Sequence, residues 1–366
     1  MKASVNIPCF VSRAGLFLTL AITTALAAPV AIAPAAWGDT QQPQVAIDEA
    51  GVMYVVFGRG EEIYVAISND SGTHFQTPQR VGRLHKLALG MRRGPRIAAS
   101  GRAVTVTAIT NEDLWAYHSE NGGSTWSMPV RINSVATSAR EGLGNLAAGP
   151  GGRFYATWLD LRAGSTQIYG ALSRDGGKTW DANELVYRSP DGHVCECCHP
   201  SAAFNNRGDI IVMWRNALKG SRDLWAATRR ADSEHFEPPA KQGSGSWKLD
   251  GCPMDGGAIF AQEDGSFASI WQRDQGVYLS TTPAKEQRLG SGKQPLALVA
   301  QGTLHAWWQQ GAHLLHATSA KAYTAERFAE DAKFAAATVS PKDGTIIVVF
   351  ERTVGQRKTI FAEVLR

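Results

Sequence analysis

Three octapeptides decide the fold of this chain: Ser68-Asn69-Asp70-Ser71-Gly72-Thr73-His74-Phe75, Ser119-Glu120-Asn121-Gly122-Gly123-Ser124-Thr125-Trp126 and Ser173-Arg174-Asp175-Gly176-Gly177-Lys178-Thr179-Trp180. They share a serine, an Asp or Asn two residues later, a glycine two residues after that, and a closing aromatic residue. The shared positions are Ser68, Asp70, Gly72, Phe75; Ser119, Asn121, Gly123, Trp126; and Ser173, Asp175, Gly177, Trp180. An Asp or Asn side chain can bond its own backbone, glycine tolerates positive φ, and an aromatic ring can anchor a hairpin. The pattern therefore predicts three equivalent turns between strands.

The octapeptides belong to a longer repeat, because their first residues lie 51 and 54 positions apart. Each unit opens with a short apolar segment, and the openings are Pro43–Ala46, Pro95–Ala98, Gly144–Ala147, Pro200–Ala203, Pro253–Gly256, Pro295–Leu298 and Phe334–Ala337. A second, β-branched and aromatic strand follows, with its last large apolar residue at Phe57, Ile109, Trp158, Trp214, Trp271, Trp307 or Phe350. Period-two alternation and glycine turns indicate strands and not helices.

The repeat predicts an all-β chain built as a β-propeller of four-stranded antiparallel blades. Each unit is about 35 to 55 residues long, which is the size of one blade. The count favours seven blades, although six remain open if one unit is misassigned. We expect residues near Trp37 to complete the last sheet.

The octapeptides resemble the Asp-box (BNR) repeats of the sialidase superfamily of β-propellers, and the resemblance covers essentially the whole chain after its first residues. In that superfamily the Asp-boxes lie on the outer rim, so they bear on fold and not on chemistry. The resemblance implies a central site in which arginines hold a substrate carboxylate, a tyrosine with a glutamate partner acts as nucleophile, and an aspartate acts as acid/base.

Five residues are candidates for parts of that catalytic set. Arg215, in Trp214-Arg215-Asn216, resembles the second arginine, and Arg96, in Pro-Arg-Ile-Ala, resembles the first. Glu351 resembles the glutamate that supports the first arginine, and Asp160 is an acid/base candidate, as is Asp274.

The rest of the set is missing at the matching positions. The glutamate position falls near His199 or Pro200, and the tyrosine position falls at Phe334 or Ala335. Without a phenol and its glutamate, the retaining mechanism has no nucleophile. The resemblance therefore implies an incomplete catalytic set.

Polar residues recur just after the second strand of the units, where the loops should form one ring around the channel mouth. We expect ligand contacts from Arg59, Arg162, Arg273 and Asp274 in these loops. A guanidinium group suits an acidic ligand because it can pair with a carboxylate through two parallel hydrogen bonds.

The cysteines form a second candidate site. They lie in two segments, Cys195-Glu196-Cys197-Cys198-His199 at the start of the fourth unit and Cys252-Pro253-Met254 at the start of the fifth. Both stretches should lie at the channel mouth. Two disulfides between neighbouring blades are the favoured interpretation. A copper or zinc site formed by Cys195, Cys197, Cys198, His199, Cys252 and Met254 is an alternative, since thiolate, thioether and imidazole groups suit soft metals. A redox dithiol is a third.

The first 35 residues are expected to be an export signal, with Lys2 and Arg13 before the apolar run 14–28 and small residues at Ala25–Ala27 and Ala33–Ala35. Residues 36–366 are then a single propeller domain that is periplasmic or secreted, with no membrane span. That domain has 35 basic and 33 acidic residues, so its charge offers no footprint for nucleic acid.

The sequence thus leaves two functions open. One is a non-catalytic ligand-binding or assembly protein with a cysteine-rich channel mouth. The sequence requires no cofactor for it, and copper or zinc at the cysteine cluster is the one candidate. Its partners would be an acidic glycan, another small ligand or a periplasmic protein. The other is a sialidase-type glycoside hydrolase acting on acidic glycans.

Overall fold

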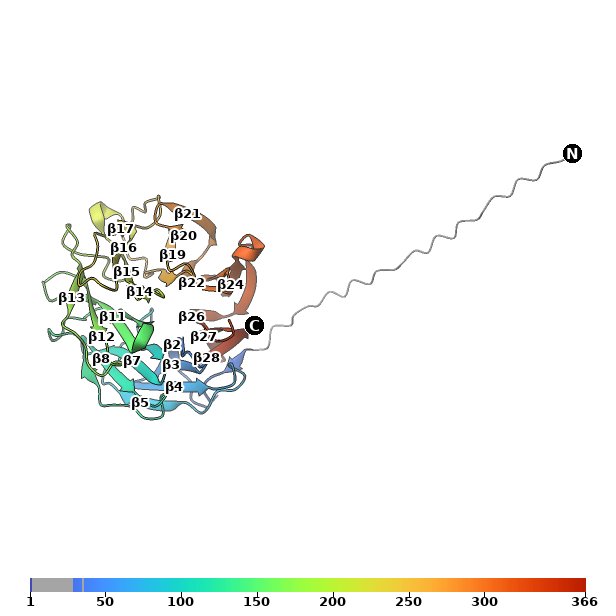
Figure 1. Cartoon of the computed structure of the whole chain (residues 1–366), viewed down its shortest axis with the longest axis horizontal. Helices are drawn as coiled ribbons and strands as arrows, with labels where there is room; N and C mark the ends of the chain where they lie inside the picture. Colours follow the sequence, from blue (N-terminus) through green and yellow to red (C-terminus); the bar gives the residue numbers. More distant parts are fainter. Residues whose placement is uncertain (2–28, 35) are drawn as a thin grey trace.

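A computed structural model of the chain describes residues 1, 29–34 and 36–366; the expected export signal lies almost entirely outside the described residues. Within the described part, seven four-stranded antiparallel sheets are arranged in a ring (Figure 1). None of the helices in that part has the length and apolarity needed to cross a membrane. The expectation of a seven-bladed propeller is therefore confirmed.

Each of the first six sheets is formed by four consecutive strands. The first three blades are β2 (Gln41–Ile47), β3 (Met53–Arg59), β4 (Glu62–Ser68) and β5 (Gln79–Arg83); β6 (Arg96–Ser100), β7 (Ala103–Thr110), β8 (Asp113–Ser119) and β9 (Val130–Arg131); and β10 (Gly144–Gly149), β11 (Arg153–Asp160), β12 (Gln167–Ser173) and β13 (Glu184–Tyr187). The next three are β14 (Ser201–Phe204), β15 (Ile210–Arg215), β16 (Leu224–Arg229) and β17 (Ala240–Lys241); β18 (Ala258–Ala261), β19 (Phe267–Arg273), β20 (Gly276–Thr282) and β21 (Lys285–Ser291); and β22 (Lys293–Ala300), β23 (Thr303–Gln310), β24 (His313–Thr318) and β25 (Glu326–Glu330). Within residues 36–366, three single-turn 3₁₀ helices lie in connections: η1 (Pro150–Gly152), η2 (Leu218–Gly220) and η3 (Ser319–Lys321).

The seventh blade closes the ring with strands from both ends of the chain. It consists of β26 (Ala332–Val339), β27 (Ile346–Val354), β28 (Arg357–Leu365) and the outer strand β1 (Val30–Ala31). Val30 pairs with Ala362 and Ala31 with Phe361. The strand that completes the blade therefore comes shortly before Trp37, which packs against the same interface, and it falls inside the segment expected to be an export signal.

The apolar core is divided among the seven interfaces between neighbouring blades. On β11, Phe154 and Trp158 pack towards the second blade, whereas Tyr155 and Leu159 pack towards the fourth. Successive side chains of a strand point to opposite faces, so one alternating strand supplies two interfaces. The large apolar residues predicted near the end of each second strand are all buried in these interfaces.

The three octapeptides form the same turn after β4, β8 and β12. In the third copy, Ser173 Oγ donates to Asp175 Oδ1 (2.9 Å) and accepts from the backbone N–H of Gly177 (2.8 Å), which has φ +86°. Asp175 Oδ1 also accepts from the backbone N–H of Thr179 (3.0 Å). The first two copies repeat these bonds. The turn chemistry expected from the sequence is thus present in the fold.

Six of the seven predicted unit openings overlap an innermost strand. The exception is the fifth, because Pro253–Gly256 precedes β18 and forms part of the loop that leads into it. Asp255 Oδ1 accepts from the backbone N–H of Gly257 (2.9 Å), and Met254 has φ +55°. This turn delays the strand and leaves Cys252 and Met254 in the loop that leads into the fifth blade.

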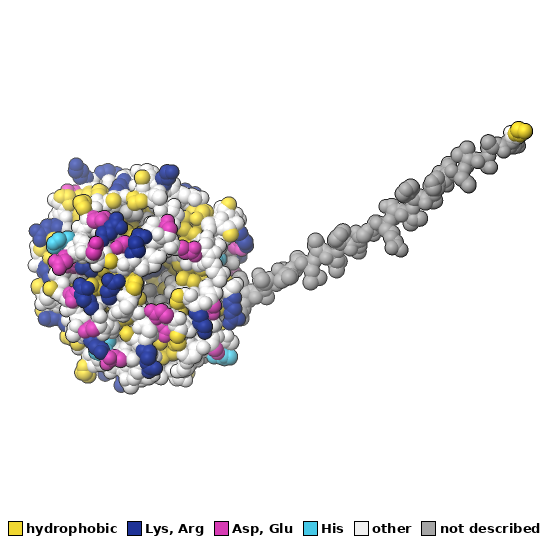
Figure 2. Space-filling model, in the orientation of Figure 1, with side chains coloured by type: hydrophobic (Ala, Val, Ile, Leu, Met, Phe, Trp, Pro, Cys, Tyr) yellow, Lys and Arg dark blue, Asp and Glu magenta, His cyan; other side chains and the backbone are white. Residues whose placement is uncertain are grey.

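The surface carries charges of both signs in close alternation (Figure 2). Lys and Arg side chains lie next to Asp and Glu side chains over the face shown, without a continuous basic area. This distribution agrees with the near-balance of charge in the sequence.

Candidate functional site at the channel mouth

Five sulfur atoms gather where the chain enters the fourth and fifth blades. This sulfur cluster consists of Cys195, Cys197, Cys198, Cys252 and Met254. A disulfide joins Cys197 to Cys252, with their Cα atoms 6.2 Å apart, and Met254 Sδ lies 3.2 Å from Cys252 Sγ. One of the two expected disulfides is therefore formed, and it links two neighbouring blades.

Cys195 and Cys198 are free thiols, and both are buried. Their Sγ atoms lie 3.3 Å apart, and Cys195 Sγ is 3.7 Å from Cys197 Sγ. The backbone holds this turn, because the N–H of Cys195 donates to the carbonyl of Arg215 (3.0 Å) at the end of β15. The spacing of this free pair is Cys-x-x-Cys, which agrees with the dithiol that the sequence offered as a third interpretation.

The two thiols have different acidities. The hydrogen bond with Cys198, aided by the nearby guanidinium groups of Arg215 and Arg222, lowers the pKa of Cys195 to about 7, although burial opposes this shift. Burial raises the pKa of Cys198 well above its ordinary value, and the charge on Cys195 adds to the effect. The pair thus releases its first proton near neutral pH, and the second is held much more strongly.

An axial cavity of about 270 Å³ lies inside the ring of inner strands. Its polar lining includes Gln44, Arg92, Arg96, Asn145, His199 and Ser201. Burial lowers the pKa of Arg96 to about 10, with the neighbouring charge of Arg92 adding to the shift. Two guanidinium groups therefore share the cavity wall.

His199 belongs to this cavity and not to the sulfur cluster. Its Nε2 lies 3.1 Å from the carbonyl oxygen of Gly257, so Nε2 carries the proton and donates. Burial, with the charges of Arg92 and Arg96 nearby, holds the pKa of His199 well below its ordinary value. The neutral ring leaves Nδ1 buried without a hydrogen-bond partner among the described residues.

Arg215, the best match to a carboxylate-binding arginine, is fully buried, and its guanidinium group is bonded to backbone carbonyls. Its Nε, Nη1 and Nη2 atoms donate to the carbonyls of Asp255 (2.8 Å), Arg222 (2.6 Å) and Gln272 (2.9 Å). These bonds tie β15 to the fifth blade. The orientation of Arg215 therefore does not favour its predicted role in catalysis.

Arg96 is held in a similar way. Its Nε donates to the carbonyl of Gly144 (3.0 Å), and its other guanidinium nitrogens donate to the carbonyls of Arg92, Gly94 and Pro95. Glu351 accepts from the backbone N–H of Gln42 (3.2 Å) and lies 3.6 Å from Lys358 Nζ. None of these bonds joins Glu351 to either arginine, so the predicted glutamate–arginine unit is not assembled among the described contacts.

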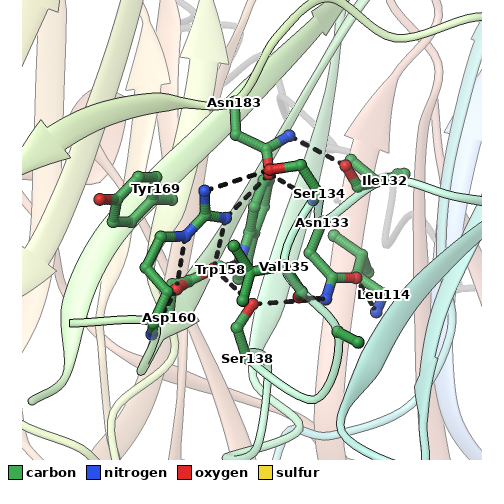
Figure 3. Close-up of polar contacts among 12 residues, drawn as sticks. Leu114, Ile132, Asn133, Ser134, Val135, Ser138, Trp158, Asp160, Tyr169 and Asn183 are labelled. Carbon is green, nitrogen blue, oxygen red and sulfur yellow. Dashed lines mark hydrogen bonds and ion pairs between the residues drawn. The ribbon is translucent and has the colours of Figure 1, made fainter. Parts of the chain in front are cut away.

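Asp160 forms the centre of a separate polar network (Figure 3). It accepts from Arg162, Ser138 Oγ (2.8 Å) and Trp158 Nε1 (2.7 Å), and its side chain is fully buried. Burial alone would raise the pKa of Asp160, but these hydrogen bonds outweigh it and hold the pKa below its ordinary value. A carboxylate held ionised in this way is a poor proton donor.

The predicted ligand-binding residues make contacts within the chain. Arg162 pairs with Asp160 and lies over the ring of Tyr169, with a centroid distance of 4.0 Å. Arg273 pairs with Glu286 (2.6 Å) and lies over Tyr278, and Arg59 donates to the carbonyl of Trp37 (3.2 Å). Asp274 is exposed in the tight turn between β19 and β20. The side chains of these three arginines thus contact groups of the chain itself and stabilise the loops that carry them.

Arg92 is a site residue that sequence reasoning missed. Its Nη2 donates to the carbonyl of Gln294 (2.9 Å), whereas its buried Nε has no partner among the described residues. No carboxylate oxygen in the described part of the chain lies within 4.0 Å of the guanidinium nitrogens of Arg92, Arg96 or Arg215. No motif marks Arg92, because only the turn before β6 brings it to the cavity.

Neither a protein-family model nor a curated protein sequence matches this chain. Among solved structures, a protein of unknown function from Dyadobacter fermentans is 13% identical, with 93% of this chain and 98% of that one covered and a TM-score of 0.54. YCF48 from Cyanidioschyzon merolae is 14% identical, with coverages of 92% and 98% and a TM-score of 0.51. A mutant of NanB sialidase from Streptococcus pneumoniae is 11% identical, with coverages of 93% and 70% and a TM-score of 0.51. At these identities the likeness concerns fold alone: the chain has a sialidase-like β-propeller fold.

Proposed function

We propose that this protein is an exported, non-catalytic binding protein whose sulfur cluster takes a soft metal ion, Cu(I). The observation that carries the proposal is the buried pair of free thiols: Cys195 Sγ and Cys198 Sγ lie 3.3 Å apart. The sulfur of the disulfide-bonded Cys197 lies within 4.8 Å of both. Cys252 and Met254 continue the same cluster. Thiolate and thioether sulfur atoms are the ligands that Cu(I) prefers.

Charge and donor type favour copper over zinc at this position. A Cu(I) ion held by the two thiolates of Cys195 and Cys198 carries a net negative charge, which the nearby guanidinium group of Arg215 would offset. Structural Zn(II) sites use Cys, His or carboxylate ligands, and a thioether such as Met254 is not among them. His199 donates to Gly257 and faces the axial cavity, so it is not included in the proposed ligand set.

The channel wall supports a non-catalytic role. Ala335, one of the two positions where the resemblance expects the tyrosine, contributes only a methyl group to the cavity lining. Asp160 is bound in its own network, as described above. Hydrolysis of a fluorogenic sialoside by the purified protein would contradict this part of the proposal.

Export is consistent with the Cys197–Cys252 disulfide, since disulfides persist mainly in oxidising compartments. Cleavage of the expected signal after Ala27 would leave β1 in the seventh blade, whereas cleavage after Ala35 would remove it. We therefore favour the earlier position, which N-terminal sequencing of the exported protein would test.

Cu(I) titration of the fully reduced protein against a chromophoric chelator, without oxygen, tests the metal site. We expect one tightly bound ion, and we expect Cys195→Ser and Cys198→Ser to lose at least about tenfold in affinity. Met254→Leu should weaken binding, whereas Met128→Leu, an exposed methionine, is the matched control. Failure of the protein to compete with the chelator would overturn the proposal, as would tighter retention of Zn(II).

A second candidate function is the binding of a small acidic ligand in the axial cavity. It is favoured by the buried guanidinium groups of Arg92 and Arg96. Neither forms an ion pair within 4.0 Å with a carboxylate of the described residues, and the charge of Asp255 acts on Arg92 from farther away. Buried charges are costly unless they are paired, so an anion would stabilise this wall. Thermal-shift measurements with sialic acid and glucuronate should show stabilisation that Arg92→Met abolishes; no shift with either acid would contradict the idea.

A further inference from the structure

We infer that the Cys195/Cys198 dithiol exchanges with the Cys197–Cys252 disulfide, so that one disulfide moves between the mouth of the channel and the buried turn. The inference concerns the regulation of the proposed metal site and rests on that proposal only for its consequence for copper. The exchange itself needs no metal ion.

The observation behind it is the packing of two thiols against a disulfide. Cys195 Sγ and Cys198 Sγ lie 3.7 Å and 3.9 Å from Cys197 Sγ, and only 3.3 Å from each other. A thiolate opens a disulfide by direct attack on one of its sulfur atoms. All four cysteine sulfurs can therefore be linked through neighbouring attacks without the approach of a second molecule.

The first step is attack of the Cys195 thiolate on Cys197 Sγ. A bond forms between Cys195 and Cys197, the bond between Cys197 and Cys252 breaks, and the electron pair leaves on Cys252. Cys252 is exposed, so its thiolate can take a proton from water. The proton that Cys195 gave up is balanced by the one that Cys252 gains.

The second step is attack of the Cys198 thiolate on Cys195 Sγ. The Cys195–Cys198 bond forms, and Cys197 leaves as a thiolate that is then protonated. Two thiols and one disulfide are present before and after the two steps. No external oxidant or reductant is required.

The two forms differ in where they present thiols. In the first form, the free pair is the buried Cys195 and Cys198, and the disulfide ties the fourth blade to the fifth. In the second, the free pair is Cys197 and the exposed Cys252 beside Met254, and the inter-blade link is open. The exchange would move a metal-binding thiol pair from a buried to a solvent-facing position, where a partner thiol could receive the ion.

A bound ion should oppose the exchange. Cu(I) held by Cys195 and Cys198 occupies the sulfur lone pairs that the two attacks need. Loading the buried pair would therefore lock the Cys197–Cys252 disulfide, and loss of the ion would release it.

Alkylation without reductant tests the exchange in the full-length, disulfide-containing protein. Iodoacetamide should trap each exposed Cys252 thiol as it forms, and peptide mapping should then show alkylated Cys197 and Cys252 with a Cys195–Cys198 disulfide. Cys195→Ser should slow the alkylation of Cys252 at least about tenfold, because the attacking sulfur is absent. In Cys198→Ser the exchange should stop after its first step, so that peptide mapping shows a Cys195–Cys197 disulfide and an alkylated Cys252.

The wild-type result alone can overturn the inference, whether or not the variants fold. The inference is overturned if Cys195 and Cys198 are alkylated while the Cys197–Cys252 disulfide stays intact. It is also overturned if no cysteine is alkylated. Cu(I) titration of the fully reduced protein is a separate measurement, so copper binding without exchange and exchange without copper binding are distinguishable. If both hold, Cu(I) should protect Cys252 from alkylation.

Discussion

Arg162 holds Asp160 through two parallel hydrogen bonds, from Nε to Oδ1 (2.9 Å) and from Nη2 to Oδ2 (2.8 Å). The two residues lie at the end of β11 and in the loop that follows it, and neither lines the axial cavity. A bidentate pair of this kind fixes both side chains. A carboxylate that looked like an acid/base in the sequence therefore serves to hold the loop.

Replacing Asp160 by asparagine should destabilise the protein by about 2–4 kcal/mol, because Arg162 is left largely buried without its partner. Urea unfolding at pH 7 measures this loss. Since the pKa of Asp160 is lowered in the fold, its contribution is present above the unfolded value of about 4 and is lost as pH falls through the folded value. The difference between the variant and the wild type should therefore shrink in acid.

The matched control for this substitution is Asp274→Asn in the exposed turn after β19, which should change stability by less than about 0.5 kcal/mol. If the two substitutions lower the free energy of unfolding equally, the hydrogen bonds of Asp160 do not contribute more to stability than an exposed turn residue does.

Glu363 should make the fold less stable as pH rises. Burial raises the pKa of Glu363 to about 7, although Arg352 acts in the opposite direction. A raised folded pKa means that stability is full below the unfolded value of about 4.5 and is lost as pH rises through about 7. Relative to Glu363→Gln, the wild type should lose about 1–3 kcal/mol between pH 4.5 and pH 8. Parallel pH profiles for the two proteins, or a similar effect of the exposed Glu234→Gln, would contradict this.

The N-terminal strand should be needed for a closed ring. A chain beginning at Ala36 lacks the β1 pairing and the buried side chains of Ile32 and Ala33, so it should be about 2–4 kcal/mol less stable than one beginning at Pro29. Urea midpoints of the two chains measure the difference. Ile32→Ala in the longer chain should reproduce part of the loss, and identical midpoints for all three chains would show that β1 does not dock.

The Cys197–Cys252 disulfide should stabilise the junction between the fourth and fifth blades. It closes a loop with a sequence separation of 55 residues, and a link of that size contributes about 2–4 kcal/mol. A phosphine reductant should lower the unfolding midpoint of the wild type but not of Cys252→Ser. A reductant effect of equal size in both proteins would place the stabilisation elsewhere.

The architecture could be predicted because its signals are local. The Ser-x-Asp/Asn-x-Gly turns satisfy their own backbone groups, and alternation along strands such as β11 supplies two blade interfaces at once. Both patterns repeat along the chain and need no knowledge of distant contacts. The displaced fifth opening is instructive, because Asp255 and Met254 form a turn where the pattern alone suggested a strand.

The candidate site was predicted only in part. The sequence predicted that both cysteine segments lie close together. Which cysteines pair and which stay free depends on which Sγ atoms face each other where the two blades meet. The resemblance singled out Arg215 and Arg96, yet their donors are used by backbone carbonyls. Arg92 reaches the cavity through a turn that carries no motif.

By itself, the sequence determined the repeating unit and the strand order within each blade and favoured seven units over six, because turn chemistry and side-chain alternation act over a few residues. Only the tertiary structure decided that Val30–Ala31 completes the last blade and that Cys197 pairs with Cys252. It likewise decided that Asp160 holds Arg162. These contacts depend on the orientation of side chains and edges when the ring closes, and no short stretch of sequence encodes that orientation.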